Sequence, residues 1–198
     1  MKRIIVPFLL IVLATGATAQ EVSSRAKAMR MMTFARPEYN VKDIKMFADT
    51  MTVYALDEQV VYPFGKWKTI EQFITEGQLK WDRETGYKKL LDTAHVSANT
   101  LQRLDGSSID VYRSTRTGLM EILSARITDP EVAFLNGMHP GLTKDEVFNV
   151  FFKAYPKSYT NDVMVLKVVS GAHEIEQVYT FKGRRLRHIQ VRSRYKYY

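Results

Sequence analysis

The sequence predicts an α+β protein in which short capped helices pack on an antiparallel sheet. Two of the observations behind this prediction are the helix-start patterns at Thr69 and Thr143 and the two-residue alternation of apolar side chains from Ser108 onward. The third is a chain with no cysteine but with 45% hydrophobic and 12% aromatic residues. Such a chain must rest on a packed core and not on disulfides. The lack of cysteine also excludes thiol catalysis and cysteine-type zinc sites.

Residues 1–19 are typical of a secretory signal peptide. A positive start, MKR, precedes the apolar run IIVPFLLIVL, and Ala17-Thr18-Ala19 is a small-x-small cleavage site. The run is short for a membrane span, and no cysteine follows it for lipid attachment. We therefore expect an exported chain, periplasmic or secreted, that is soluble after cleavage near Ala19 and has no transmembrane span in the mature part. An uncleaved N-terminal anchor is the alternative.

Residues 20–62 form a segment of mixed helical and extended character. Residues 22–36 are rich in Ala, Met and Arg and predict a helix. Apolar residues from Ile44 to Ala55 follow a helical period, but the later stretch TVYALDEQVVYPF is rich in β-branched and aromatic residues and could equally be strand. We predict helix up to about residue 50 and strand after it.

Residues 63–135 form a first predicted α+β module. Its Thr69-Ile70-Glu71-Gln72 has the T-x-x-Q form of a capping box and predicts a short helix starting at Thr69. The charged, turn-rich stretch 75–100 predicts a long loop. Then IDVYRSTR and LMEILSARIT predict antiparallel strands around Thr117-Gly118, and EVAFL (131–135) predicts another strand.

Residues 136–198 form a second predicted α+β module. GLTKDEVFNVFFKAYP contains a T-x-x-E capping box from Thr143 and predicts a helix with one aromatic face, stopped by Pro156. Three strands are expected after it, NDVMVLKVVS, EIEQVYTF and RLRHIQVRSRY, with turns at Gly171 and at Lys182-Gly183-Arg184. Strict alternation in the last strand places these residues on one face: Leu186, His188, Gln190, Arg192 and Arg194.

The second module resembles a known family. "NGMHPGLTKDEVFNVFFKAYP", followed after a hairpin by "VYTFKGRRLRHIQV", is similar to β-lactamase-inhibitor-protein-like (BLIP-like) domains, a module shared by small outer-membrane assembly lipoproteins of the SmpA/OmlA type. The matching residues are Gly141, Leu142, Thr143, Asp145, Glu146 and Val147 at the helix start, and Phe181, Gly183 and Leu186 near the final turn. The resemblance covers 137–195 and extends weakly to 63–135 as a degenerate tandem copy. It implies a fold whose exposed sheet contacts proteins and which has no catalytic motif. The lipid-bearing cysteine of the lipoproteins is absent here.

No motif in the sequence indicates catalysis, a metal or a cofactor. None of the four histidines has an H-x-x-x-H partner, and His173 and Glu174 would point to opposite faces of a strand. G-x-S-x-G, G-x-G-x-x-G and the P-loop pattern do not occur. We therefore expect no cofactor. A Ser-His-Asp triad or a carboxylate pair assembled from distant residues stays open.

The formal charge of +8 is concentrated toward the end of the sequence, where no acidic residue follows Lys182. The candidate binding residues are Arg184, Arg185, Arg187, Arg192 and Arg194 of the last strand, with Trp81 of the 75–100 stretch. These arginines also fit a role that involves no partner, because charge on a solvent face or sheet edge hinders edge-to-edge pairing between sheets.

The favoured interpretation is a non-enzymatic exported binding or envelope-assembly protein. Its sheet face or the 75–100 loop would contact another envelope or secreted protein. Two alternatives remain open: a cell-envelope hydrolase whose site is not visible in sequence, and a polyanion binder that meets anionic lipid or glycan through the basic last strand. Nucleic acid is not an expected partner in that compartment.

Overall fold

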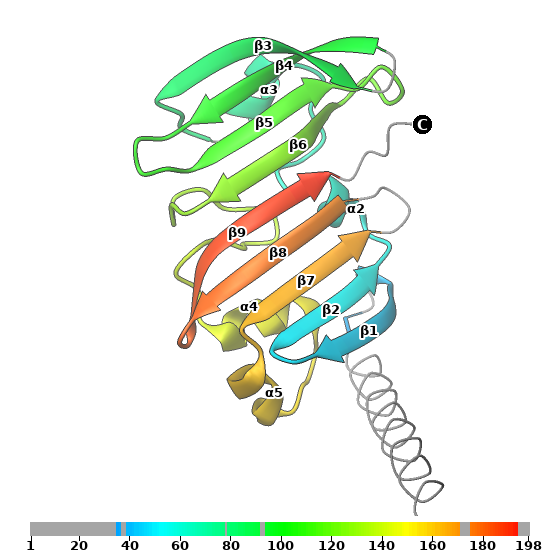
Figure 1. Cartoon of the computed structure of the whole chain (residues 1–198), viewed down its shortest axis with the longest axis vertical. Helices are drawn as coiled ribbons and strands as arrows, with labels where there is room; N and C mark the ends of the chain where they lie inside the picture. The colour runs from blue at the N-terminus through cyan, green and yellow to red at the C-terminus, as the bar shows by residue number, and fades with distance from the viewer. Residues whose placement is uncertain (1–34, 37–38, 78, 92–93, 171–174, 194–198) are drawn as a thin grey trace, which may run out of the picture.

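The computed structural model describes residues 35–36, 39–77, 79–91, 94–170 and 175–193, with the backbone alone for 87–91 and 94–96. These residues form one nine-stranded sheet in the order β1-β2-β7-β8-β9-β6-β5-β4-β3 (Figure 1). The strands are β1 (Val41–Phe47), β2 (Thr50–Ala55), β3 (Arg83–Leu91), β4 (Ala94–Gln102), β5 (Ser108–Arg113), β6 (Met120–Ile127), β7 (Val165–Ser170), β8 (Ile175–Lys182) and β9 (Arg185–Ser193). The α+β class predicted from the sequence is confirmed.

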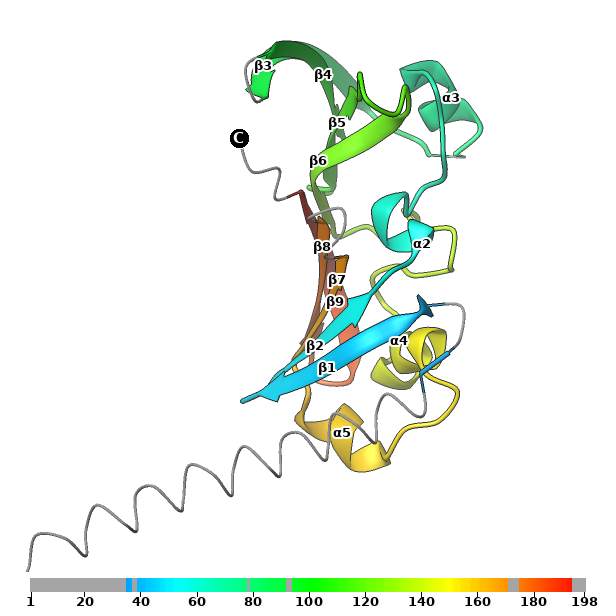
Figure 2. The same cartoon turned by 90° about the vertical axis from the view of Figure 1, so that its right-hand side faces the viewer.

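The helices of the described residues all lie on one side of the sheet (Figure 2). They are α2 (Glu58–Val61), α3 (Ile70–Thr75), α4 (Lys144–Phe151) and α5 (Lys157–Asp162). The core fills the space between these helices and the sheet, where Phe73, Phe148 and Tyr179 are among the largest fully buried side chains. The opposite side of the sheet, called the open face below, carries no helix of the described residues (Figure 2).

The sheet is mixed and not purely antiparallel as predicted. Neighbouring strands are antiparallel except β2 and β7, which pair in parallel from Thr50↔Val165 to Tyr54↔Val169. These two strands are far apart in the sequence, so no tight turn forces them to run in opposite directions. The strands β3–β6 join the rest of the sheet through β6 and β9 alone, which pair over Ser124–Ile127 and Ile189–Arg192.

The helix predicted at Thr143 is confirmed with its capping box. The Thr143 Oγ1 accepts from the Glu146 backbone N–H at 3.2 Å, and the Glu146 carboxylate accepts from the Thr143 backbone N–H at 2.7 Å. Behind this cap, Val147, Phe148 and Phe151 are buried against the sheet. The helix ends at Phe151, earlier than predicted, because the extended Phe152 forms a bridge with Ala35. Pro156 instead occupies the N-cap position of α5, where its side chain makes no capping hydrogen bond.

The helix predicted from Thr69 is also confirmed. The Thr69 side chain accepts from the Gln72 backbone N–H, as in a capping box. The reciprocal bond differs, because the Gln72 side-chain oxygen accepts from Lys68 N at 3.0 Å. This change still occupies a backbone donor at the helix entrance.

The helix predicted up to residue 50 is wrong, because this segment forms the β1–β2 hairpin. The chain reverses at Ala48-Asp49, so Ile44 and Met51 reach the core from two strands and mimic one helical face. Phe47, which shared that predicted face, is instead 84% exposed. The strand expected after residue 50 is confirmed as β2 and ends at Ala55. The predicted helix 22–36 lies outside the described residues except for Ala35-Arg36.

Two predictions between residues 75 and 135 are also wrong. The stretch 75–100 is not a long loop, because it contains β3 and most of β4. Its charged composition fits an edge strand, and Arg83 and Glu84 are exposed there. EVAFL has the burial alternation of a strand, with Val132 and Phe134 buried, but it pairs with no strand of the described residues. Its Leu135 N–H donates to Pro63 O at 2.8 Å in an irregular segment.

The expected face of the last strand needs one correction. Leu186 is buried in the core and does not share a face with His188, Gln190 and Arg192. A β-bulge causes this, because Phe181 pairs with Leu186 whereas the preceding Thr180 pairs with His188. The extra residue reverses the alternation at that point. The turn predicted at Lys182-Gly183-Arg184 is confirmed, and Gly183 has φ +60°. The turn predicted at Gly171 lies outside the described residues.

Candidate protein-binding face

The open face can be read from the strand register. Core side chains such as Val53, Leu166, Tyr179 and Ile189 fix the inner face, so alternate residues point outward. Three rows then cross the open face from β1 toward β6 and β5. They are Phe47, Thr50, Val165, Thr180 and His188; Lys45, Thr52, Lys167, Val178, Gln190 and Arg126; and Asp43, Tyr54, Val169, Glu176, Arg192, Ser124 and Asp110.

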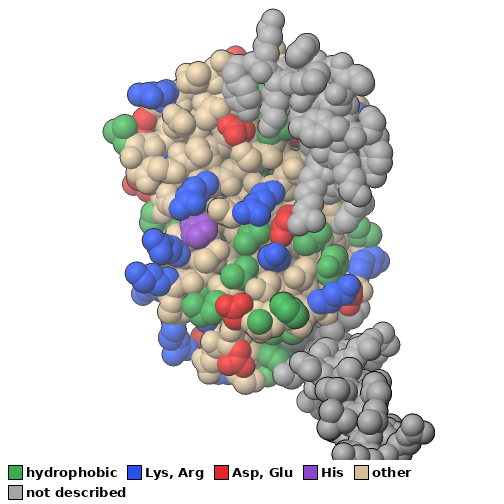
Figure 3. All heavy atoms as spheres, viewed as in Figure 1, with side chains coloured by type: hydrophobic (Ala, Val, Ile, Leu, Met, Phe, Trp, Pro, Cys, Tyr) green, Lys and Arg blue, Asp and Glu red, His purple; other side chains and the backbone are tan. Residues whose placement is uncertain are grey.

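An apolar strip lies over β2, β7 and β8 on this face. It consists of Tyr54, Val165, Val169 and Val178, which belong to adjacent strands in the three rows. Figure 3 shows hydrophobic side chains gathered over the lower half of the face with charged groups around them. The Lys45 ammonium lies 5.1 Å from the centre of the Tyr54 ring, so its charge borders the strip. Phe47 stands at the edge of the strip.

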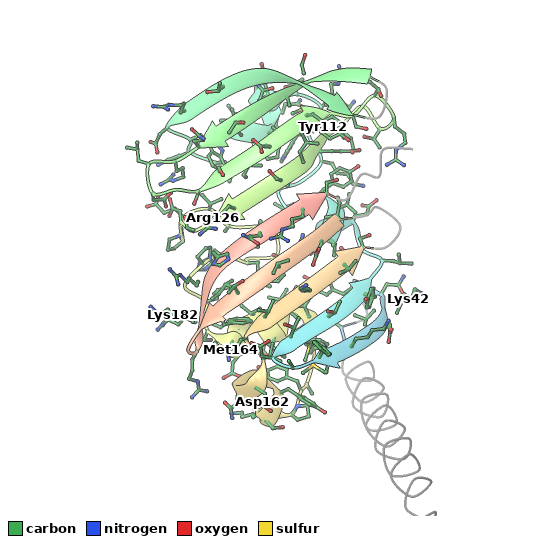
Figure 4. The ribbon with its side chains drawn as sticks, in the orientation of Figure 1. Lys42, Tyr112, Arg126, Asp162, Met164 and Lys182 are labelled. Carbon is green, nitrogen blue, oxygen red and sulfur yellow. The ribbon has the colours of Figure 1, made fainter. Side chains whose placement is uncertain are left out.

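A basic group lies where β6 meets β9. We call Arg126, Arg187, His188, Gln190 and Arg192 the seam cluster. Arg126 comes from β6 (Figure 4), and the others come from β9. The Arg192 Nη2 donates to Gln190 Oε1 at 2.9 Å, which orients that guanidinium. Burial lowers the pKa of His188, and the positive charges of Arg126 and then Arg187 lower it further.

The carboxylates of the open face are engaged by other groups. Glu176 is 3% exposed and lies 3.5 Å from Lys167 Nζ. Asp110 accepts from Thr100 at 2.6 Å and from Ser124 at 2.7 Å. Among the described residues, no carboxylate forms an ion pair with Arg126, Arg187 or Arg192. All three arginines are exposed.

The structure separates the binding residues predicted from the last strand. Arg184 lies 3.8 Å from Asp145 of α4, and Arg185 Nη1 donates to Gly141 O at 2.8 Å. Both are therefore tied to the helix side of the turn. Only Arg187 and Arg192 reach the seam cluster, while Arg194 lies outside the described residues.

Trp81 is not an exposed binding aromatic. Its ring is partly buried and packs against the core, and its buried indole Nε1 has no hydrogen-bond partner among the described residues. Arg126 was missed by sequence reasoning, because it belongs to a strand far from the basic end of the sequence. The one available signal was the polar alternation of Ser124 and Arg126 within the apolar run of LMEILSARIT.

The described residues offer neither a metal cluster nor a membrane-spanning helix. No three His, Asp or Glu side chains in this part of the chain are placed to hold a metal ion. The helices described here are all too short or too polar to cross a bilayer. Comparison with protein-family models, curated proteins and solved structures found no match to the chain.

Proposed function

We propose that this chain is an exported, non-enzymatic binding protein that contacts another envelope or secreted protein through its open face. The observation that carries the proposal is the apolar strip, in which Tyr54, Val165 and Val169 are partly exposed around the buried Val178 and no described helix covers them. An apolar centre with a charged border is the composition that protein interfaces favour. The signal peptide expected at residues 1–19 supports the compartment.

We also infer that the two halves are degenerate BLIP-like modules. Each module has a capped helix followed by an antiparallel meander: α3 precedes β3–β6, and α4, followed by α5, precedes β7–β9. This common order supports the resemblance. The second module has an extra helix, α5, and three strands where the first has four, so the likeness concerns the order of elements and not matched residues.

The test is capture of the partner from the organism's own envelope fraction by the tagged chain, with single charges placed on each side of the sheet. Val169→Glu puts a carboxylate in the apolar strip, and it should lower retention of a stoichiometric partner at least about tenfold, since a desolvated unpaired charge is costly. Leu135→Glu is the matched control, because Leu135 is 66% exposed and its N–H bonds to Pro63, outside the sheet. Equal loss in both variants, or no partner at all, would contradict the proposal.

A further inference from the structure

The seam cluster is a local excess of oriented positive charge. Arg126 and Arg192 lie on neighbouring strands, displaced by two residues in the register Arg126↔Gln190 and Ser124↔Arg192. Diagonal pairs of this kind have Cα atoms about 7–8 Å apart, within the reach of two long side chains toward one group. Gln190 lies between them and holds the Arg192 guanidinium by its Oε1. The guanidinium groups of Arg126 and Arg192, called the two jaws below, therefore stand on either side of the Gln190 side-chain amide.

Neither Arg126 nor Arg192 forms an ion pair within 4 Å with a carboxylate of the described residues. Arg192 faces Glu176 in the register, but that buried carboxylate lies beside Lys167 and forms no ion pair with Arg192. Arg126 lies diagonal to Asp110, whose two oxygens accept from Thr100 and Ser124. Guanidinium groups bind carboxylates through paired N–H donors, so both jaws keep donors for an external anion.

The neighbours of the seam cluster decide which anion fits. Glu176 and Asp110 stand on either side of Arg192 and Ser124 in the third row, so the positive charge of the cluster is short and does not form a continuous basic track across the sheet. On the β8 side, Val178 lies directly opposite Gln190 and continues into the apolar strip. The surface therefore suits a short anionic group with apolar neighbours and not an extended glycan or a lipid surface.

Building on the proposed function, we propose that Arg126 and Arg192 form a clamp for a Glu or Asp side chain of the protein partner. The partner segment lays apolar side chains on the strip over β7 and β8 and places its carboxylate at the seam. The buried centre of the interface is then apolar, and the clamp supplies direction and specificity at its border.

The clamp can be tested before the partner is known. The probe is the blocked peptide Val-Glu-Glu-Val, and its twin Val-Gln-Gln-Val keeps the shape without the charges. The labelled protein is titrated with each peptide, and the Gln190 side-chain amide and arginine Nε–H signals are followed by NMR. We expect weak binding of the Glu peptide, on the order of a millimolar, as befits a short flexible ligand. The Gln peptide should bind about tenfold more weakly.

The variants separate the clamp from general basic charge. Arg126→Gln with Arg192→Gln removes both jaws, and it should weaken the Glu peptide about tenfold. Arg184→Gln removes the same charge per site from a residue next to Asp145 of α4, and it should change binding less than about twofold. All three substitutions are at exposed side chains, and circular dichroism confirms that the variants fold.

Several outcomes overturn the clamp. One is equal binding of the two peptides, and another is an equal loss for Arg184→Gln and the double variant. Binding of a heparin hexasaccharide or of phosphatidylglycerol vesicles without binding of the Glu peptide would replace it with polyanion recognition. In the envelope capture, retention of the partner that depends on Val169 but not on Arg126 and Arg192 would refute the clamp and support the proposed function. A capture with no partner refutes the proposed function, and the peptide titration then tests the clamp independently.

Discussion

Replacing Thr143 by Ala tests how much the capping box of α4 contributes to the fold. The substitution removes the hydroxyl that accepts from Glu146 N at 3.2 Å and lies 2.8 Å from the Glu146 carboxylate. It leaves the 2.7 Å bond from the Thr143 backbone N–H to that carboxylate. Loss of an N-cap side chain costs about 1 kcal/mol. For a chain of this size, the melting temperature should fall by about 2–4 °C.

The same substitution should change the pH dependence of stability. The backbone N–H of Thr143 and then its hydroxyl lower the pKa of Glu146 from 4.5. A carboxylate with a lowered pKa contributes stability that is present above its unfolded value and lost as the pH falls through the folded value. Thr143→Ala removes the hydroxyl contribution, so the loss of stability below about pH 4.5 should become shallower but not vanish.

Urea denaturation at pH 7 and at several values below 4.5 measures both effects, and Thr143→Ser is the matched control because it keeps the hydroxyl. The reasoning fails if Thr143→Ala costs less than about 0.3 kcal/mol at pH 7, or if Thr143→Ser costs as much as Thr143→Ala. It fails equally if the acid limb of the stability curve is the same in the wild type and in Thr143→Ala.

Three further predictions concern other parts of the molecule. Ala48→Gly should stabilise the folded protein by up to about 1 kcal/mol, since Ala48 has the left-handed φ of +49° that glycine adopts more easily. Gly137→Ala, at φ +78°, should destabilise it for the same reason. Changes of the same sign in the free energy of unfolding, measured in urea, would contradict both predictions. Phe148→Ala should cost about 3–5 kcal/mol, because this ring is fully buried against Phe152 and Tyr155, and a cost near that of a surface change would refute its core position. Because the pKa of His188 is lowered from 6.5 in the folded protein, stability should fall as the pH drops below about 6.5. His188→Gln should make this fall of stability with pH less steep. An unchanged pH dependence in the variant would contradict the prediction.

The parts of the fold that local chemistry decides could be predicted from the sequence. A capping box needs only four consecutive residues, and both Thr69 and Thr143 cap helices as predicted. The β8–β9 turn was equally local, since Gly183 supplies the positive φ. The exact end of α4 was not local, because the bridge between Phe152 and the distant Ala35 decides it.

Other features depend on which strands become neighbours. A hairpin that places Ile44 and Met51 in one core has the spacing of a helix, and only its partner β7 resolves the ambiguity. The prediction of the candidate site was incomplete for the same reason. The sequence predicted a basic last strand. The bulge at Thr180-Phe181 and the pairing of β9 with β6 decide that Arg192 lies on the open face and that Arg126 lies beside it. Neither the bulge nor that pairing leaves a pattern that one sequence can reveal.

The position of β9 has a consequence for folding kinetics. This strand is made after all the other strands of the sheet, yet it is the one that joins β3–β6 to β8. The edge of β6 therefore stays unpaired until Ile189–Arg192 of β9 pair with it. Such non-local closure is slow, and an unpaired edge invites wrong partners. Wrong pairing during this interval would lower the yield of folded protein even when the finished core is stable.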